Sequence, residues 1–203
     1  GGVRTWQELH GIPCISFEDT AQAKKQIMIS RTFAKEITDL DELSAQVSMF
    51  CSMAVEKLRK QNSCCGNVTV FIMTNRFHRD SGREQFESRI VQFPTDTDST
   101  LEINTAVMRT TREMYRDGYG YKRAGVMLGD IIPAGKVQLS FFDDVDRERH
   151  SRLMSVMDSI NRKEGRNTIG VASQSLEGIK MNREHLSPCY TTDWNDIISV
   201  NCR

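Results

Sequence analysis

Two long helical patterns, each flanked by β-rich segments, are the feature that most restricts how this chain can fold. In residues 38–61 and again after residue 99, apolar side chains recur at the three- and four-residue spacing of an amphipathic helix. Asp39 with Glu42, and Ser99 with Glu102, fit capping boxes at the two helix starts. The apolar positions are Leu40, Leu43, Val47, Phe50, Cys51, Ala54, Val55 and Leu58 in the first helix, and Ile103, Ala106, Val107, Thr110 and Met114 in the second.

Four segments rich in β-branched and aromatic residues surround these helices, at residues 25–33, 67–76, 88–93 and 121–132. Pro94 is predicted to end the third strand. The order strand, helix, strand, strand, helix, strand predicts an α+β fold. In this βαββαβ arrangement, both helices cover one face of a four-stranded antiparallel sheet. The opposite face would stay open, as a binding surface.

The two ends of the chain read differently. Residues 3–10 look like the end of a helix stopped by Gly11. Beyond Gly135 we expect a small α/β or irregular tail, with a helix in residues 147–165 and a strand at 167–173. The predicted apolar stripe of that helix is Leu153, Val156, Met157 and Ile160.

Composition excludes some classes of protein. Among 203 residues, 27 Lys and Arg balance 27 Asp and Glu, so the chain is not a strongly basic nucleic-acid binder in bulk, although local patches can still act. No apolar run is long enough to cross a membrane, and the first residues lack the apolar centre of a signal peptide. The six cysteines match no zinc spacing, so we expect reduced thiols in a cytoplasmic protein.

No catalytic motif stands out. The glycines of "DGYGYKRAG" lack phosphate-loop spacing, and the four histidines are scattered. Asp143, Asp144 and Asp146 resemble metal-binding carboxylates, but they lie on a predicted connecting segment, where solvated acids are the better interpretation. The sequence therefore favours a binding module over a complete enzyme.

Several motifs together resemble the C-terminal portion of Y-family translesion DNA polymerases of the UmuC type. They are "ISRTF", "KRAGVMLGD", "QLSFFDD", and the tail segments "LMSVMDSINRKEGRNTIGVASQ" and "LSPCYTTDWNDII". Cys189 stands where the family's Ser-Pro-Arg-Tyr-Thr-Thr motif has arginine, which puts any role of that arginine in doubt. The resemblance implies a thumb end and linker (1–20), a little-finger domain (21–135), a clamp-binding peptide (136–142) and a UmuC-type tail (143–203).

The resemblance also implies what these residues lack. The palm carboxylates that hold the catalytic Mg ions are not among them, so we expect no cofactor and no catalytic residue here. We expect these residues to be a non-catalytic part of an error-prone polymerase of the SOS response. The whole protein would be a DNA-directed DNA polymerase.

In that family the little finger contacts the primer-template duplex, and contacts to phosphates hold DNA without reading its sequence. The matching positions are Ser30, Arg31 and Thr32 in the first strand and Lys122 and Arg123 in the fourth, with Arg76 as a weaker candidate. The alternative is that these cations are merely solvated.

"QLSFF" resembles the short peptide with which bacterial polymerases dock on the sliding clamp. Gln138, Leu139, Ser140, Phe141 and Phe142 form it, with Phe141 where leucine is usual. The alternative is that Leu139 and Phe142 cover the domain's own core as an edge strand.

The family implies a processed UmuD dimer and the recombinase filament as further partners, in addition to duplex DNA and the sliding clamp, and no membrane. Two other interpretations remain open at this stage. One is an unrelated ferredoxin-like RNA-binding module, which would stack bases on exposed aromatic side chains. The other is a small ferredoxin-like enzyme, which the absence of an acid, base or metal set disfavours.

Overall fold

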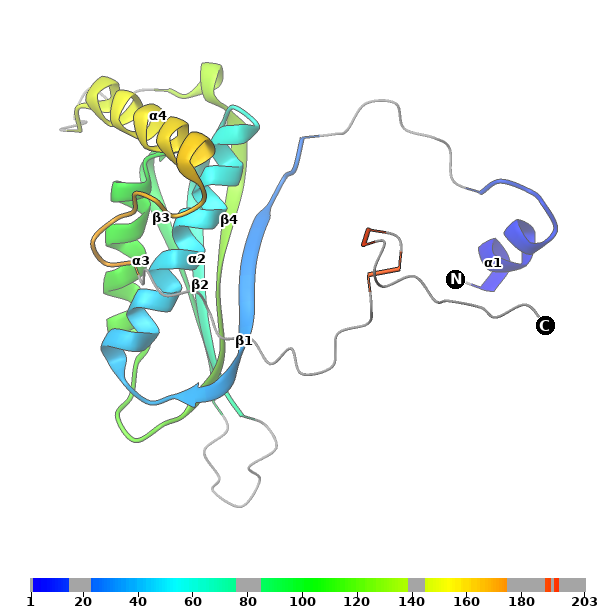
Figure 1. Cartoon of the computed structure of the whole chain (residues 1–203), viewed down its shortest axis with the longest axis horizontal. Coiled ribbons are helices and arrows are strands. Elements are labelled where there is room, and N and C mark those ends of the chain that lie inside the picture. The colour runs from blue at the N-terminus through cyan, green and yellow to red at the C-terminus, as the bar shows by residue number, and fades with distance from the viewer. Residues whose placement is uncertain are drawn as a thin grey trace.

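The computed structural model describes residues 2–14, 23–75, 85–138, 145–174, 189–190 and 192–193 (Figure 1). Every helix and strand expected up to residue 133 is present, and the predicted strand–helix order is confirmed. The elements are α1 (Gly2–Leu9), β1 (Ile27–Ile37), α2 (Leu40–Lys60), β2 (Ser63–Thr74), β3 (Phe86–Thr97), α3 (Thr100–Met114), β4 (Tyr121–Pro133), the 3₁₀ helix η2 (Ala134–Lys136) and α4 (Arg147–Glu164).

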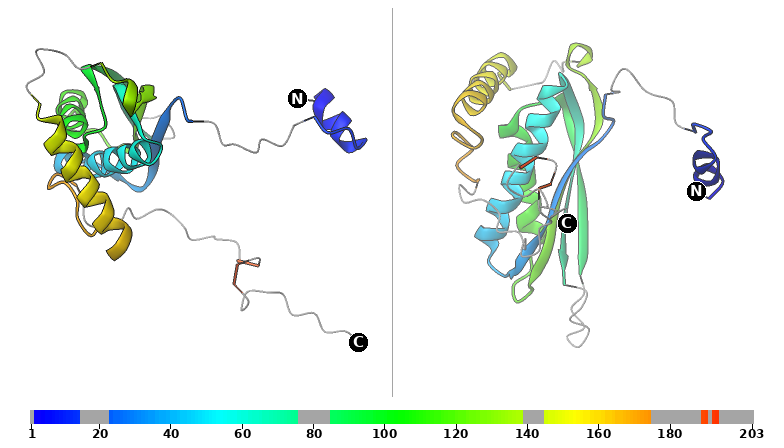
Figure 2. Two further views of the ribbon diagram at one scale, coloured as in Figure 1. Left: turned by 90° about the horizontal axis from the view of Figure 1, so that it is seen from above. Right: turned by 45° about the vertical axis from the view of Figure 1, so that its right-hand side comes forward.

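The four strands form one sheet in the order β1-β4-β2-β3. All three neighbouring pairs are antiparallel, which confirms the predicted α+β class. The two helices α2 and α3 lie on the same face of the sheet (Figures 1 and 2). In this order β4 and β2 are central, whereas β1 and β3 are edge strands.

The core lies between the sheet and the two helices. Its helix side consists of the predicted stripes, with Leu43, Val47 and Phe50 of α2 and Ile103 and Val107 of α3 among the fully buried side chains. Strand residues alternate between the two faces of a sheet. The strands accordingly contribute every second residue to this core, among them Ile27, Ile29 and Phe33 of β1, Val68, Val70 and Ile72 of β2, and Ala124, Val126 and Leu128 of β4.

Of the two predicted helix caps, only Asp39 makes a side-chain cap bond. The Asp39 carboxylate accepts a hydrogen bond of 2.8 Å from the Glu42 backbone N–H, as expected for a helix N-cap. Ser99 is the N-cap residue of α3 but makes no side-chain cap bond. Its hydroxyl lies 2.9 Å from Nδ1 of His150 instead, because α4 packs against this helix start.

The prediction that Pro94 ends the third strand is wrong, because β3 continues to Thr97. Proline lacks a backbone donor and is tolerated in edge strands and at bulges. Pro94 meets both conditions, since β3 pairs only with β2 and the register shifts between the Cys65–Thr97 and Asn67–Gln92 pairs.

The tail helix α4 is confirmed, but only Met157 and Ile160 of its predicted apolar stripe are half-buried. Leu153 and Val156 are 43% and 56% exposed, and Met154 is the buried residue. Residues 167–173, predicted as a strand, form turns. The described part of the tail packs on α2 and α3, where Ser173 Oγ lies 2.9 Å from Ser48 Oγ and accepts a 2.7 Å hydrogen bond from Asn104.

Across the described ranges, none of the helices has the length and apolar character needed to span a bilayer.

Candidate nucleic-acid interface

None of the described helices covers the sheet face opposite α2 and α3 (Figure 2). Strand alternation and the paired register place one set of side chains on it. The set mixes hydroxyl and amide groups with a row of apolar side chains, and it includes a single cation. Its members are Met28, Ser30 and Thr32 of β1, Arg123 and Met127 of β4, Asn67, Thr69, Phe71 and Met73 of β2, and Phe86, Ser88, Ile90 and Gln92 of β3.

Arg123 forms the polar centre of this open face. Thr32 is its register partner on β1, and its Nη2 donates a 3.0 Å hydrogen bond to Ser30 Oγ. Its Nε is buried and has no hydrogen-bond acceptor in the described part of the chain. A guanidinium N–H shielded from water without an acceptor is unfavourable. The Nε itself is shielded, so only the accessible remainder of this half-buried guanidinium group can meet an external acceptor.

An apolar strip runs beside this centre. A Cβ atom at Gly125 would lie 2.5 Å from Cζ of Phe71, so the glycine lets the phenyl ring lie close over β4. The Phe71 and Phe86 rings are 6.1 Å apart, and Phe86 and Ile90 are 60% and 64% exposed. Sequence reasoning missed this strip because in "VTVFIMT" both faces of the strand carry apolar residues.

The structure brings together only three of the predicted DNA contacts, Ser30, Thr32 and Arg123. Arg31 alternates with Ser30 and Thr32, so it starts from the side of the buried Ile29 and Phe33 at the β1 edge. Its Nη1 donates 2.8 Å to the Ser30 carbonyl.

Lys122 lies at an irregularity, where β2 residues Met73 and Thr74 pair with Arg123 and Tyr121. Its ammonium donates a 2.8 Å hydrogen bond to the Ala34 carbonyl. Arg31 and Lys122 thus both contact backbone carbonyls of the edge strand β1, and their role in DNA binding stays a prediction.

Other predicted site residues lie outside the described ranges. These are Arg76, the clamp-peptide residues Leu139, Ser140, Phe141 and Phe142, and the acids Asp143 and Asp144. Gln138 is described and exposed. Asp146 accepts a 3.0 Å hydrogen bond from the Arg149 backbone N–H and is the N-cap of α4, which accounts for this acid without a metal.

The titratable side chains of the described residues indicate neither a metal site nor a catalytic nucleophile. Among the described residues, no group of three or more His, Cys, Asp and Glu side chains is placed to hold a metal ion. Burial raises the pKa of the Cys51 and Cys64 thiols to about 12, and burial also raises the pKa of Cys65. A thiol is nucleophilic only as thiolate, so these three are structural groups.

Comparison with known proteins gives two family matches. The family described as "impB/mucB/samB family C-terminal domain" matches residues 24–141. A second family, described only as a domain of unknown function, matches residues 151–200, the region of α4 and the following tail.

Several known proteins and solved structures are similar to this chain. Protein UmuC of Salmonella typhimurium is 37% identical over 199 residues, which is 97% of this chain and 47% of the relative. DNA polymerase IV of Clostridium acetobutylicum is 24% identical over 168 residues, 83% of this chain and 40% of the relative. A solved complex of beta-clamp processivity factor and little finger domain of PolIV aligns with a TM-score of 0.40 at 16% identity, covering 58% of this chain and 99% of the matched one. The chain thus spans about half the length of the curated relatives it matches.

Proposed function

Since the chain belongs to the impB/mucB/samB family, whose C-terminal domain it contains in residues 24–141, we propose that it binds duplex DNA for an error-prone translesion polymerase. The relatives of UmuC type and the relative named DNA polymerase IV support the polymerase part of this proposal. The family match also argues against an unrelated RNA-binding module. Synthesis itself, its Mg ions and the SOS role would belong to the whole polymerase.

The observation that carries the DNA-binding proposal is the state of Arg123. It lies on a sheet face that no described helix covers, and its half-buried guanidinium group has no carboxylate partner in the described ranges. A phosphate oxygen would accept from the accessible part of this guanidinium group, and the hydroxyl groups of Ser30 and Thr32 would donate to the same backbone. Such contacts hold DNA in position and are indifferent to its sequence, which lesion bypass requires.

The test is duplex binding by fluorescence anisotropy across a range of salt. We expect Arg123→Gln to weaken binding on every sequence by about tenfold, because one charge-assisted hydrogen-bonding group is lost. The slope of log affinity against log salt should fall by about one phosphate contact. Arg112→Gln, an exposed arginine on α3 at the opposite side of the domain, is the matched control. Equal losses in both variants, or a loss confined to one sequence, would refute the assignment.

We further propose that residues 138–142 dock on the bacterial sliding clamp. Leu139, Phe141 and Phe142 would enter an apolar cleft, and Gln138, which is exposed, would hydrogen-bond at the rim. A short peptide orders few residues on binding, so the isolated interaction should be weak, and linkage to DNA binding would strengthen it.

A titration with purified clamp tests this second part. The natural chain should bind with a Kd of roughly micromolar or weaker, as expected for a short linear peptide. The variant with Leu139, Phe141 and Phe142 changed to alanine should not bind. Binding of equal strength by both chains would eliminate the peptide as the docking site.

The remaining partners follow from the family alone. The processed UmuD dimer and the recombinase filament would meet the polymerase in the cytoplasm, where bacterial DNA lies. No described residue assigns either contact.

A further inference from the structure

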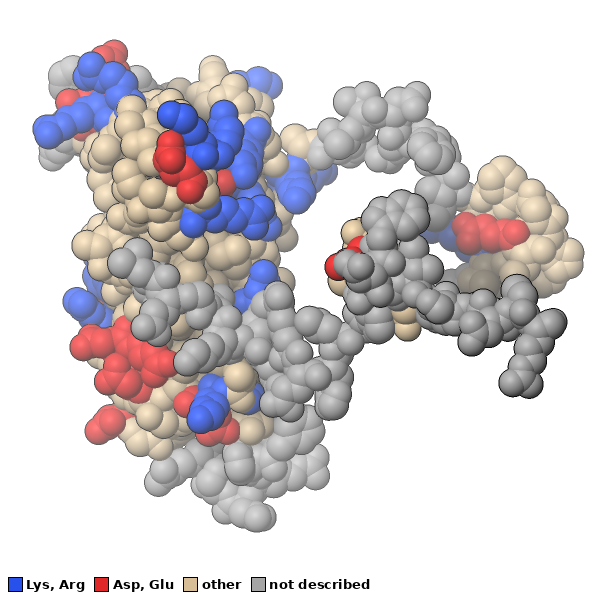
Figure 3. All heavy atoms as spheres, viewed as in Figure 1, with Lys and Arg blue, Asp and Glu red and all other residues tan. Residues whose placement is uncertain are grey.

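The C-terminal ends of α2 and α4 line a pocket of about 310 Å³. Both helices lie on the side of the sheet away from its open face (Figure 2). Lysine and arginine side chains gather at this end of the molecule (Figure 3). The volume is at the lower end of the roughly 300–1,000 Å³ typical of small-ligand sites. The charged residues that line it are Glu56, Arg59, Lys60, Asp158, Arg162 and Arg166.

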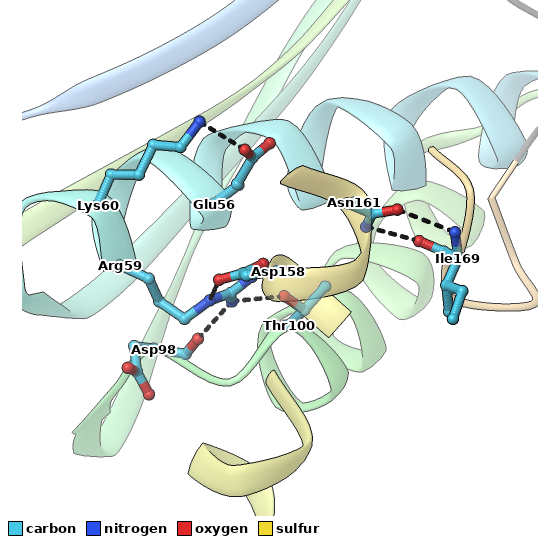
Figure 4. A network of polar contacts seen from close by, with 8 residues as sticks. All are labelled: Glu56, Arg59, Lys60, Asp98, Thr100, Asp158, Asn161 and Ile169. Atoms are coloured by element: carbon cyan, nitrogen blue, oxygen red, sulfur yellow. Dashed lines mark hydrogen bonds and ion pairs between the residues drawn. The ribbon is translucent and has the colours of Figure 1, made fainter. Parts of the chain in front are cut away.

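Arg59 fixes the wall of this pocket (Figure 4). Its Nε and Nη2 donate to the two carboxylate oxygens of Asp158, both at 2.7 Å. Its Nη1 donates to the Asp98 carbonyl at 3.0 Å and to Thr100 Oγ1 at 2.8 Å. One side chain thereby joins α2, α4 and the start of α3. Its charge is used within the wall and is not available to a ligand.

Side-chain hydrogen bonds also fix the turn that follows α4. The Asn161 side chain donates to the Ile169 carbonyl and accepts from the Ile169 N–H, each at 2.9 Å. Gly165 takes a φ of 113°, which returns the chain toward the helix, and Thr168 Oγ1 donates to its carbonyl at 2.8 Å. These contacts place Arg166 at the pocket on a defined turn.

The pocket therefore keeps two unneutralised cations. Asp158 is occupied by Arg59, and Glu56 pairs with Lys60 at 2.6 Å. Arg162 and Arg166 are exposed and have no ionic or hydrogen-bonded side-chain partner in the described part of the chain. Cations in a last helical turn also offset the partial negative charge of the helix end. That accounts for Arg162 at most, because Arg166 follows the end of α4.

We propose that this α2–α4 pocket binds a phosphate-class anion, held by the Arg162 and Arg166 guanidinium groups. Planar guanidinium donors match the oxygens of phosphate with paired hydrogen bonds. The phosphate belongs either to a free phosphate compound or to the backbone of a nucleic-acid strand. Because the pocket lies on the helical side, it is separate from the proposed duplex contact at Arg123.

The experiment is an amide NMR titration of the whole chain with sodium pyrophosphate at constant ionic strength. We expect saturable shifts at Gly165, Arg166 and Ile169. Arg162→Gln with Arg166→Gln should weaken binding by about tenfold or more per arginine. Arg149→Gln with Arg152→Gln removes the same charge from exposed positions on the same helix and should leave binding unchanged. Arg166→Gln alone lies outside the helices, so it keeps the test valid if the double variant unfolds.

A second arm distinguishes the source of the phosphate. A short oligothymidylate that displaces pyrophosphate from the chain indicates a nucleic-acid strand, and one that does not indicates a free compound. The Arg123→Gln variant should behave like the natural chain in both arms, so failure of the duplex proposal would not affect this result. Non-saturable shifts, or equal loss in the Arg149 and Arg152 variant, would overturn the proposal.

Discussion

Replacing Arg59 and Asp158 singly and together tests whether the tail is part of the folded domain. The pair joins residues that are 99 positions apart, and through the Arg59 bond to Thr100 it links α4 to both helices of the core layer. The two side chains are only 13% and 21% exposed, so neither charge is fully solvated. Removing one partner therefore leaves the other in a site that water reaches poorly.

The contacts set the size of the expected effect. Exposed ion pairs contribute about 0–1 kcal/mol, whereas breaking a buried pair costs about 3–5 kcal/mol. The Arg59–Asp158 pair is partly buried, so its loss should cost an amount between these two values. Asp158→Ala should cost about 2 kcal/mol, because Arg59 keeps its bonds to Asp98 and Thr100. Arg59→Ala removes all four bonds and should cost about 3 kcal/mol.

The assay is urea unfolding followed by far-ultraviolet circular dichroism. Independent effects would sum to about 5 kcal/mol in the double variant, and we expect about 3.5 kcal/mol, a coupling of about 1.5 kcal/mol. The Glu56–Lys60 pair on α2, exposed by 38% and 57%, is the control and should couple by about 0.3–0.5 kcal/mol. A coupling for Arg59 and Asp158 as small as the control value would refute the view that this pair fixes α4.

Two further predictions concern stability and reactivity. Asp39→Ala should cost about 1 kcal/mol by the loss of its cap bond to Glu42, measured by urea unfolding; an unchanged midpoint would contradict the N-cap assignment. Iodoacetamide at pH 8, with mass-spectrometric mapping, should modify exposed Cys189 well before Cys51 or Cys64, whose pKa values burial raises from 9.0 to about 12. The unfolded chain loses these protons first, so the free energy of unfolding should fall as pH rises from 9 toward 12. Fast labelling of Cys51 in the folded chain would contradict its burial.

The sheet and its two covering helices could be predicted from the sequence, because each of these elements buries one regularly spaced set of side chains. Leu43, Val47 and Phe50 recur at helical spacing and are all fully buried. Strand β3 was harder. Its exposed Phe86 and Ile90 look like core residues in a sequence, and only pairing with β2 places them on the open face.

The helix α4 shows where apolar periodicity misleads. The residues that face the domain include Arg147, His150, Met154, Asp158 and Asn161, again at three- and four-residue spacing, and most of them are polar. Partners far along the chain satisfy these groups, and no local pattern identifies such partners. Leu153 and Val156 stood out as apolar and were therefore assigned to the wrong face.

The contacts of α4 with the domain also affect how the proposed clamp peptide is attached. On its N-terminal side, the Ala134 N–H donates 2.9 Å to the Asn62 carbonyl, which holds the end of β4 to the domain. On its C-terminal side, Arg147 lies 3.5 Å from Glu102, and His150 contacts Ser99. The proposed clamp peptide therefore lies, in the sequence, between two segments that both contact the domain. Anchored ends leave less conformational entropy to lose on binding, so α4 would favour clamp docking without touching the clamp.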